Sequence, residues 1–137
     1  ATHNFFNCTA YLNGAGFSVG NGTQVFRNCL AIGNTSGDYG TPETMQTCGS
    51  GDATGTTTGL VDTTEFVGPS DTPKNLHLKS GATSIGIGTD LGSTNQVNID
   101  IDGQTRTAWD FGADFFSGAV AAVAGSMTPR TSYWGDL

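Results

Sequence analysis

Short stretches of alternating apolar and polar residues recur through the first half of the chain. Residues 16–19 and 23–26 are two of them, and each has the period of a strand that buries one face. Clusters of Gly, Asn, Ser and Asp separate such stretches at residues 13–14, 20–22 and 35–38. The pattern therefore predicts β-strands of a few residues joined by tight turns.

The second half continues the strand pattern less regularly. Residues 75–79, 84–88 and 97–101 alternate in the strand manner, and residues 60–67 predict a further pair of short strands. Only residues 118–124 have a composition that a short helix would tolerate. We therefore expect an all-β protein.

One motif returns at a nearly constant interval. Residues 7–13 and 28–34 share Asn, Cys, Ala and a final Asn at an offset of 21 residues, and Cys48 follows Cys29 after 19 more. About 20 residues are enough for two or three short strands with their corners, which is one coil of a β-solenoid. Equivalent side chains on successive coils then stack about 4.8 Å apart.

This stacking predicts a role for each repeated residue. Cys8, Cys29 and Cys48 would form a ladder that points inward, with Ala10 and Ala31 stacked beside it. The repeated asparagines would occupy corners, because Asn tolerates the left-handed backbone conformation that corners use. Three cysteines cannot all pair within one chain. We expect free thiols whose pKa is raised by burial, and which are therefore inert.

The segment 75–115 carries a longer sequence signature. It reads Leu-His-Leu-Lys-Ser-Gly-Ala at 76–82, Gly-Thr-Asp-Leu-Gly at 88–92, Asp-Ile-Asp-Gly-Gln-Thr-Arg at 100–106 and Trp-Asp-Phe-Gly-Ala-Asp at 109–114. In order and spacing, this series resembles the closing coil of right-handed parallel β-helix repeat proteins. Gly86, where Asp or Asn is frequent, and Phe115, where Glu is usual, are the departures.

The resemblance implies the C-terminal portion of a right-handed parallel β-helix, or solenoid. Coils and a closing coil would span residues 1–116, followed by a non-repetitive tail over 117–137. The family includes polysaccharide lyases, cell-surface proteins and phage structural proteins, so it implies architecture more strongly than activity. Tyr133 and Trp134 in the polar tail are candidate assembly contacts, with an unordered terminus as the alternative.

Composition and charge exclude several classes of function. Five basic residues stand against twelve acidic ones, for a net charge of −7. Binding to nucleic acid or to an anionic membrane needs clustered Lys and Arg, so neither partner is expected. No apolar stretch is long enough to span a membrane, and the cysteines and histidines lack the spacing of a zinc site.

Acidic residues gather in the C-terminal third, and two interpretations compete for them. Calcium prefers several oxygen ligands, which makes the cluster of Asp90, Asp100, Asp102, Asp110 and Asp114 a possible cation site, with Asp100, Asp102 and Asp110 as its main candidates. In the structural interpretation, Asp102 and Gly103 form a turn, Asp100 accepts backbone hydrogen bonds and Arg106 pairs with a carboxylate. The spacing follows no known calcium loop, so we favour the structural interpretation and predict no metal site.

The sequence shows no catalytic set. His77 stands between two leucines on a predicted strand, where we expect a histidine with satisfied hydrogen bonds. A polysaccharide lyase needs a basic residue to abstract a proton and a group that neutralises charge, yet residues 5–53 contain Arg27 as their one Lys or Arg. A hydrolase needs paired carboxylates. We predict no catalytic residues and no cofactor.

Two functions remain. The first is a non-enzymatic structural or adhesive β-helix at a virion surface or outside the cell, such as a decoration or tail-fibre component of a bacteriophage. The second is a fragment of a secreted polysaccharide lyase or glycoside hydrolase. The first coil begins without a cap, and an open strand edge needs covering by upstream sequence or another chain. We therefore expect a homo-oligomer, for which the family suggests a trimer, or other virion or surface proteins as partners, with a surface glycan as a further candidate.

Overall fold

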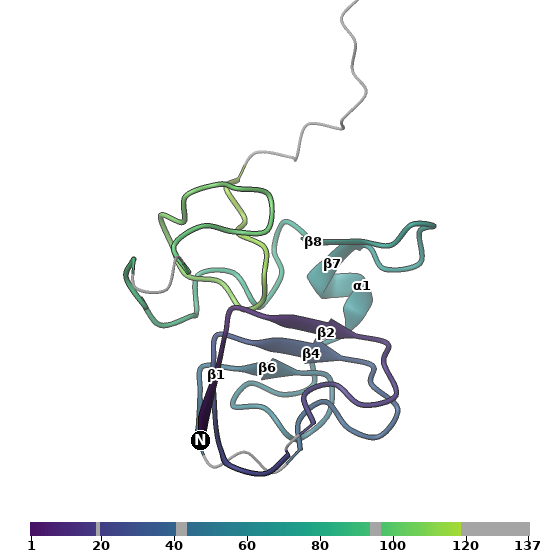
Figure 1. The fold of residues 1–137 in the computed structure, drawn as a ribbon. Helices are drawn as coiled ribbons and strands as arrows, with labels where there is room; N and C mark the ends of the chain where they lie inside the picture. The colour runs from purple at the N-terminus through teal and green to yellow at the C-terminus, as the bar shows by residue number, and fades with distance from the viewer. Residues whose placement is uncertain (19, 41–43, 94–96, 119–137) are drawn as a thin grey trace, which may run out of the picture.

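The structure is a computed structural model, and it describes residues 1–18, 20–40, 44–93 and 97–118. Strands dominate it (Figure 1). The elements in chain order are β1 (Thr2–Phe6), β2 (Thr9–Tyr11), β3 (Thr23–Arg27), β4 (Leu30–Ile32), β5 (Thr44–Gln46), β6 (Gly49–Ser50), α1 (Asp62–Glu65), β7 (Phe66–Gly68) and β8 (Asn75–Leu78). The expectation of an all-β chain is therefore confirmed for the described residues.

The first six strands form two small parallel sheets, in the orders β1-β3-β5 and β2-β4-β6. Ala10 on β2 pairs with Ala31 on β4, so partners on the first two repeats are 21 residues apart. The next step is 19 residues, because Val25 on β3 pairs with Thr44 on β5. These steps equal the offsets between the cysteines of the repeated motif, so each motif occupies the same place in its repeat.

The corner between the two sheets uses the left-handed backbone conformation in each repeat. Asn7, Asn28 and Thr47 have φ values of +47°, +52° and +51°. Asparagine is enriched in this conformation, whereas threonine is branched at Cβ and enters it rarely. The prediction that the repeated asparagines lie at corners is confirmed for Asn7 and Asn28.

The two sheets enclose an apolar interior. It contains the side chains of Ala10, Phe26, Cys29, Ala31, Tyr39 and Cys48, with Phe5, Cys8, Phe17 and Met45 packed against them. Aromatic rings stack from one repeat to the next: the ring centroids of Phe5 and Phe26 are 4.8 Å apart, and those of Phe17 and Tyr39 are 5.1 Å apart. This spacing follows from the distance between neighbouring strands.

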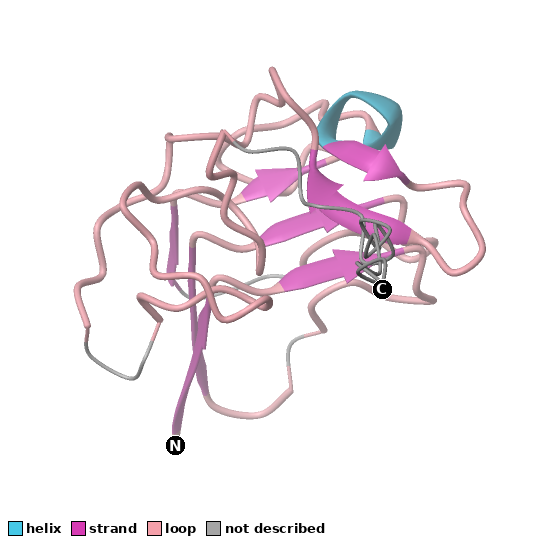
Figure 2. Ribbon diagram, turned by 90° about the horizontal axis from the view of Figure 1, so that it is seen from above, coloured by secondary structure: helices cyan, strands magenta, loops and turns pink. Residues whose placement is uncertain are grey.

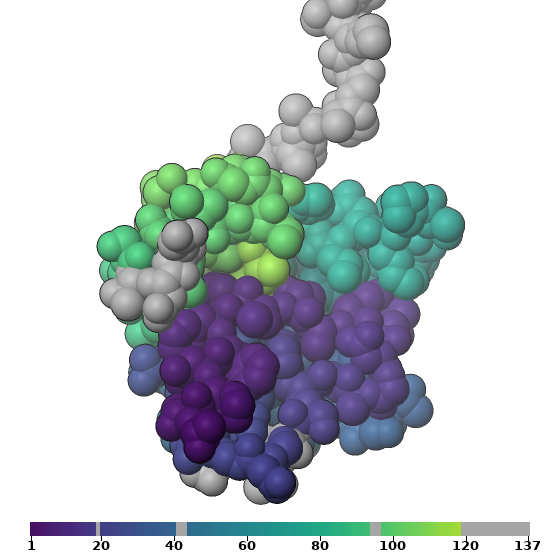
Figure 3. Space-filling view, viewed as in Figure 1, coloured from purple at the N-terminus to yellow at the C-terminus, as the bar shows by residue number. Residues whose placement is uncertain are grey.

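Strand β4 is buried on both faces. Ala31 faces the interior, whereas Leu30 and Ile32 face the opposite way and belong to a second apolar cluster. That cluster is completed by Leu60, Phe66, Leu78 and Phe111. These four come from residues 60–118, which we call the C-terminal layer. Figure 3 shows its teal and green residues resting against the purple first repeat.

The C-terminal layer adds no strand to the two parallel sheets within the described residues. β8 pairs antiparallel with β7, and Phe66 lies opposite Leu78. Of the three strands predicted over residues 75–101, only the first forms; residues 84–88 and 97–101 are turn and loop, apart from a single bridge between Ile99 and Thr105 (Figure 2). The segment expected as a closing coil therefore lies across the outer face of the second sheet.

The outward side chains of β4 give the physical reason for this arrangement. Covering Leu30 and Ile32 stabilises the fold by roughly 1.5–3 kcal/mol for each side chain. Gly49 takes the place of Leu30 on the third repeat and leaves room for the cover. A Cβ atom at Gly49 would lie only 2.6 Å from Leu60 and 2.7 Å from Phe111.

Two corner asparagines bind the C-terminal layer to the repeats. Asn7 donates from Nδ2 to the carbonyl oxygens of Asp110, at 3.1 Å, and Gly112, at 3.2 Å. Asn28 donates from Nδ2 to the carbonyl oxygen of Thr89 at 2.7 Å, and its Oδ1 accepts the N–H of Thr89 at 2.8 Å. The residues that turn the corner therefore also hold the layer in place.

Candidate functional site

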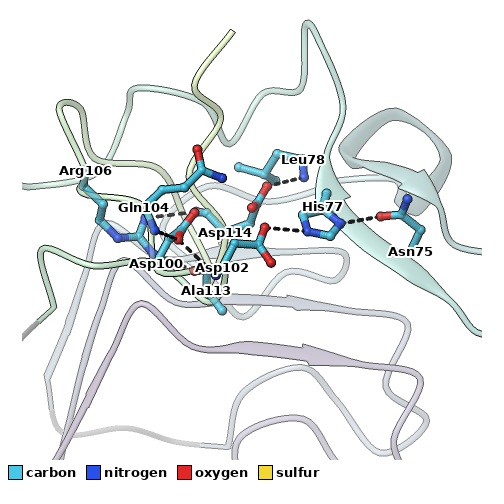
Figure 4. A network of polar contacts seen from close by, with 9 residues as sticks. All are labelled: Asn75, His77, Leu78, Asp100, Asp102, Gln104, Arg106, Ala113 and Asp114. Atoms are coloured by element: carbon cyan, nitrogen blue, oxygen red, sulfur yellow. Dashed lines mark hydrogen bonds and ion pairs between the residues drawn. The ribbon is translucent and has the colours of Figure 1, made fainter. Parts of the chain in front are cut away.

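The described residues bring one histidine and two aspartates together where the β7–β8 hairpin meets the C-terminal loops. His77 lies on β8, Asp102 on an exposed turn and Asp114 on the last described loop (Figure 4). One ligand atom from each of the three lies within 4.8 Å of the other two. We call these three residues the His77 cluster.

Asn75 fixes the orientation and the tautomer of the His77 ring. Its Oδ1 accepts the backbone N–H of His77 at 3.2 Å, which identifies this atom as the amide oxygen. The same Oδ1 lies 2.6 Å from Nδ1 of His77. Because an oxygen can only accept here, Nδ1 carries a proton. The other ring nitrogen, Nε2, lies 2.7 Å from Oδ2 of Asp102.

Asp114 is the buried member of the cluster. Its Oδ2 accepts the backbone N–H of Leu78 at 2.6 Å. Burial raises the pKa of the Asp114 carboxyl, while the hydrogen bond from Leu78 and the nearby His77 ring act in the opposite direction. Burial therefore disfavours the charged form of this carboxyl, and a nearby cation would favour it.

The His77 cluster borders a pocket of about 190 Å³. Val67, Phe115 and Phe116 supply apolar walls, and all three cluster residues line it from the polar side. Phe115 is a position at which the sequence departs from the family signature, and its side chain is part of this pocket. The arrangement can hold a small ligand or a cation.

The calcium candidates do not act together. Asp100 accepts the N–H groups of Asp102, at 3.0 Å, and Gln104, at 2.7 Å. Asp110 is fully buried and accepts the N–H groups of Gly86 and Phe116. Among the described residues, one group has metal-ligand spacing, and it joins Asp102 and Asp114 to His77, which the calcium interpretation left out.

The expected ion pair of Arg106 with a carboxylate is wrong. Its guanidinium donates to the carbonyl oxygens of Gly112, Ala113 and Asp114. A planar fork of N–H groups fits three successive carbonyls of a turn, so the side chain supports the backbone instead. Among the described residues, the one contact with ion-pair spacing joins Nε2 of His77 to Oδ2 of Asp102 at 2.7 Å.

The three thiols of the predicted ladder are free, with Cys29 and Cys48 buried and Cys8 half-buried. The neighbouring thiols of Cys48 and Cys8, together with burial, raise the pKa of the Cys29 thiol. The contact with Cys29 lowers the pKa of Cys8 to about 7 and also lowers that of Cys48. Burial acts in the expected direction on both thiols, but the neighbouring Cys29 thiol and backbone carbonyls outweigh it, so the expectation of a raised pKa is wrong for Cys8 and Cys48.

Two further expectations concern the C-terminal tail and the membrane. Tyr133 and Trp134, the candidate assembly contacts, lie outside the described residues. No helix in the described part of the chain has the length and apolar character to cross a membrane.

Searches against family models, curated proteins and solved structures found no match to this chain.

Proposed function

We propose that this chain is the C-terminal portion of a right-handed parallel β-helix with a structural or adhesive role. The observation that carries the proposal is the in-register pairing of three successive repeats in two parallel sheets. Each connection between neighbouring parallel strands passes through the other sheet, as in a solenoid. The right hand is supported by the strong preference for right-handed crossovers between parallel strands.

The state of the repeat acids supports a non-enzymatic role. Asp38 is buried, and its Oδ2 accepts the backbone N–H groups of Gly51 and Asp52. Asp52 in turn accepts the N–H of Asp38. Both carboxylates are engaged in turn geometry, whereas a glycoside hydrolase needs two that face a sugar. These contacts favour a scaffold over the lyase or hydrolase alternative.

The setting that we propose is the surface of a bacteriophage particle. Its support is the resemblance of residues 75–115 to β-helix proteins of that kind, together with an acidic, Thr- and Asn-rich composition. Partners would be further copies of the chain, other virion proteins or a surface glycan. A fold held by short-range contacts between neighbouring repeats suits a durable exterior component.

Immunogold electron microscopy tests this function directly. Antibodies raised against the purified chain should label the outside of intact particles from the source culture. Labelling confined to the interior of cells would overturn the proposed setting. In parallel, the purified chain should leave uronate and neutral polysaccharides at their starting length, and release of unsaturated or reducing ends would favour the enzymatic alternative.

A further inference from the structure

We propose that the His77 cluster binds one divalent transition-metal ion of the zinc class. The ligand atoms are Nε2 of His77, Oδ2 of Asp102 and one carboxylate oxygen of Asp114, which already lie within 4.8 Å of one another. This inference does not depend on the proposed surface role. It differs from the calcium interpretation because one of its ligands is His77, and because Asp100 and Asp110 take no part.

The hydrogen bonds of His77 supply an independent reason to place a cation there. Since Asn75 holds the proton on Nδ1, a neutral ring presents a lone pair at Nε2. That lone pair faces a carboxylate oxygen of Asp102 at 2.7 Å, and a cation bound between the two atoms would remove their repulsion. A metal-binding histidine is usually supported by an oxygen that accepts the hydrogen bond of its other ring nitrogen, as Oδ1 of Asn75 does here.

The geometry can open to accept the ion. Zinc–ligand distances near 2.0–2.1 Å place tetrahedral ligand atoms about 3.3 Å from each other, so Nε2 and Oδ2 would separate by about 0.6 Å. Asp102 is the member that can move, because it is exposed and sits on a turn with Gly103 at a φ of +81°. Asp114 keeps its bond to Leu78 through Oδ2 and can offer its other oxygen.

The donor set selects the class of ion. Calcium and magnesium prefer oxygen ligands alone, whereas an imidazole with two carboxylates suits zinc and its neighbours. Three protein ligands leave a fourth position, and the cluster borders the pocket walled by Phe115 and Phe116. The bound ion would join β8 to both C-terminal loops, so its binding stabilises the C-terminal layer.

Calorimetric titration of the metal-free chain with zinc chloride tests the proposal. All variants carry His3→Ala, because His3 is the only other histidine. The parent should bind one zinc per chain and gain several degrees in Tm, whereas calcium chloride should do neither. His77→Gln and Asp102→Asn should each weaken zinc binding at least tenfold. Asp90→Asn, an exposed acid outside the cluster, is the matched control and should bind as the parent does.

X-ray absorption at the zinc edge identifies the ligands. Nitrogen and oxygen neighbours with no sulfur would support the His77 cluster, and sulfur in the first coordination shell would assign the ion to the cysteines and overturn the proposal. Absence of zinc binding by the parent would overturn it as well, leaving a charged pair of His77 and Asp102. Unchanged binding in both His77→Gln and Asp102→Asn, with parent-like circular dichroism, would do the same.

Discussion

Asn28→Ala should loosen the attachment of the C-terminal layer. Asn28 is completely buried, and its amide makes hydrogen bonds to both backbone groups of Thr89 and to Oγ1 of Thr47. Truncation leaves the N–H and the carbonyl of Thr89 without these partners, at a cost of about 1–3 kcal/mol for each group that stays dry. Thr47 keeps its contact with Oγ1 of Thr89, so it adds little.

The backbone adds a second term to the cost of Asn28→Ala. Asn28 has a φ of +52°, and alanine in the left-handed region costs roughly 1–2 kcal/mol. Thr89 is only half-buried, so water can reach its freed backbone groups in part. The total cost of the lost hydrogen bonds and the strained backbone therefore falls at the lower end of these ranges. We expect a loss of about 3 kcal/mol in the free energy of unfolding, which is a large fraction of the stability of a small domain.

Urea unfolding measures this loss. Tryptophan fluorescence in a Trp134→Phe background reports on Trp109 in the C-terminal layer, and circular dichroism reports on the strands. Asn28→Gly is the matched variant, because it removes the same hydrogen bonds. Glycine accepts the left-handed backbone, so the free energy of unfolding of Asn28→Gly should be about 1 kcal/mol higher than that of Asn28→Ala. A loss below about 1 kcal/mol for alanine, or a less stable glycine variant, would refute the reasoning.

Two further substitutions and one labelling experiment test other parts of the fold. Phe26→Ala should cost about 3–5 kcal/mol in urea unfolding, because the ring is fully buried in the interior stack. Glu65→Ala should cost about 2–4 kcal/mol, because its buried carboxylate accepts the N–H groups of residues 83–84. Iodoacetamide should label Cys8 before Cys29, with a rate that rises through a pH of about 7 as the Cys8 thiolate forms.

Each of these predictions has a control or a contrary outcome. Ile101→Thr changes an exposed apolar side chain and should stay within about 0.5 kcal/mol of the parent. A comparable loss in Ile101→Thr and Phe26→Ala would show that the interior stack has no special role. Glu65→Gln should fall between the parent and Glu65→Ala, since it keeps one acceptor. Mass spectrometry that finds Cys29 labelled first would contradict the order of thiol pKa values.

The repeat was predictable from sequence because two copies of one motif, with the same residues, give its period. Asn7 and Asn28 begin copies of one motif, and the strands pair at that offset. The third copy is weaker, with Thr47 at the corner, yet its register follows. Where the C-terminal layer lies was not predictable, because alternation in residues 75–101 shows that one face is buried without showing which surface buries it.

The candidate site was missed for a related reason. The calcium interpretation grouped aspartates by nearness in sequence, but Asp100 and Asp110 turn to backbone N–H groups. His77 and Asp102 are 25 residues apart and meet only because the hairpin lies beside the exposed turn. A local signal did exist: Asn75 stands two positions before His77, which places both side chains on one face of a strand.

The repeats and the C-terminal layer are synthesised at different times. Hydrogen bonds between repeats join residues about 21 positions apart, whereas Asn7 reaches Gly112 across 105. At 5–20 residues per second, roughly 3–12 seconds separate the third repeat from Phe111. Over that interval Leu30 and Ile32 stand on a finished sheet without their cover. A chain ended at residue 59 should then bind more apolar dye than the full chain, and equal dye binding would contradict this order.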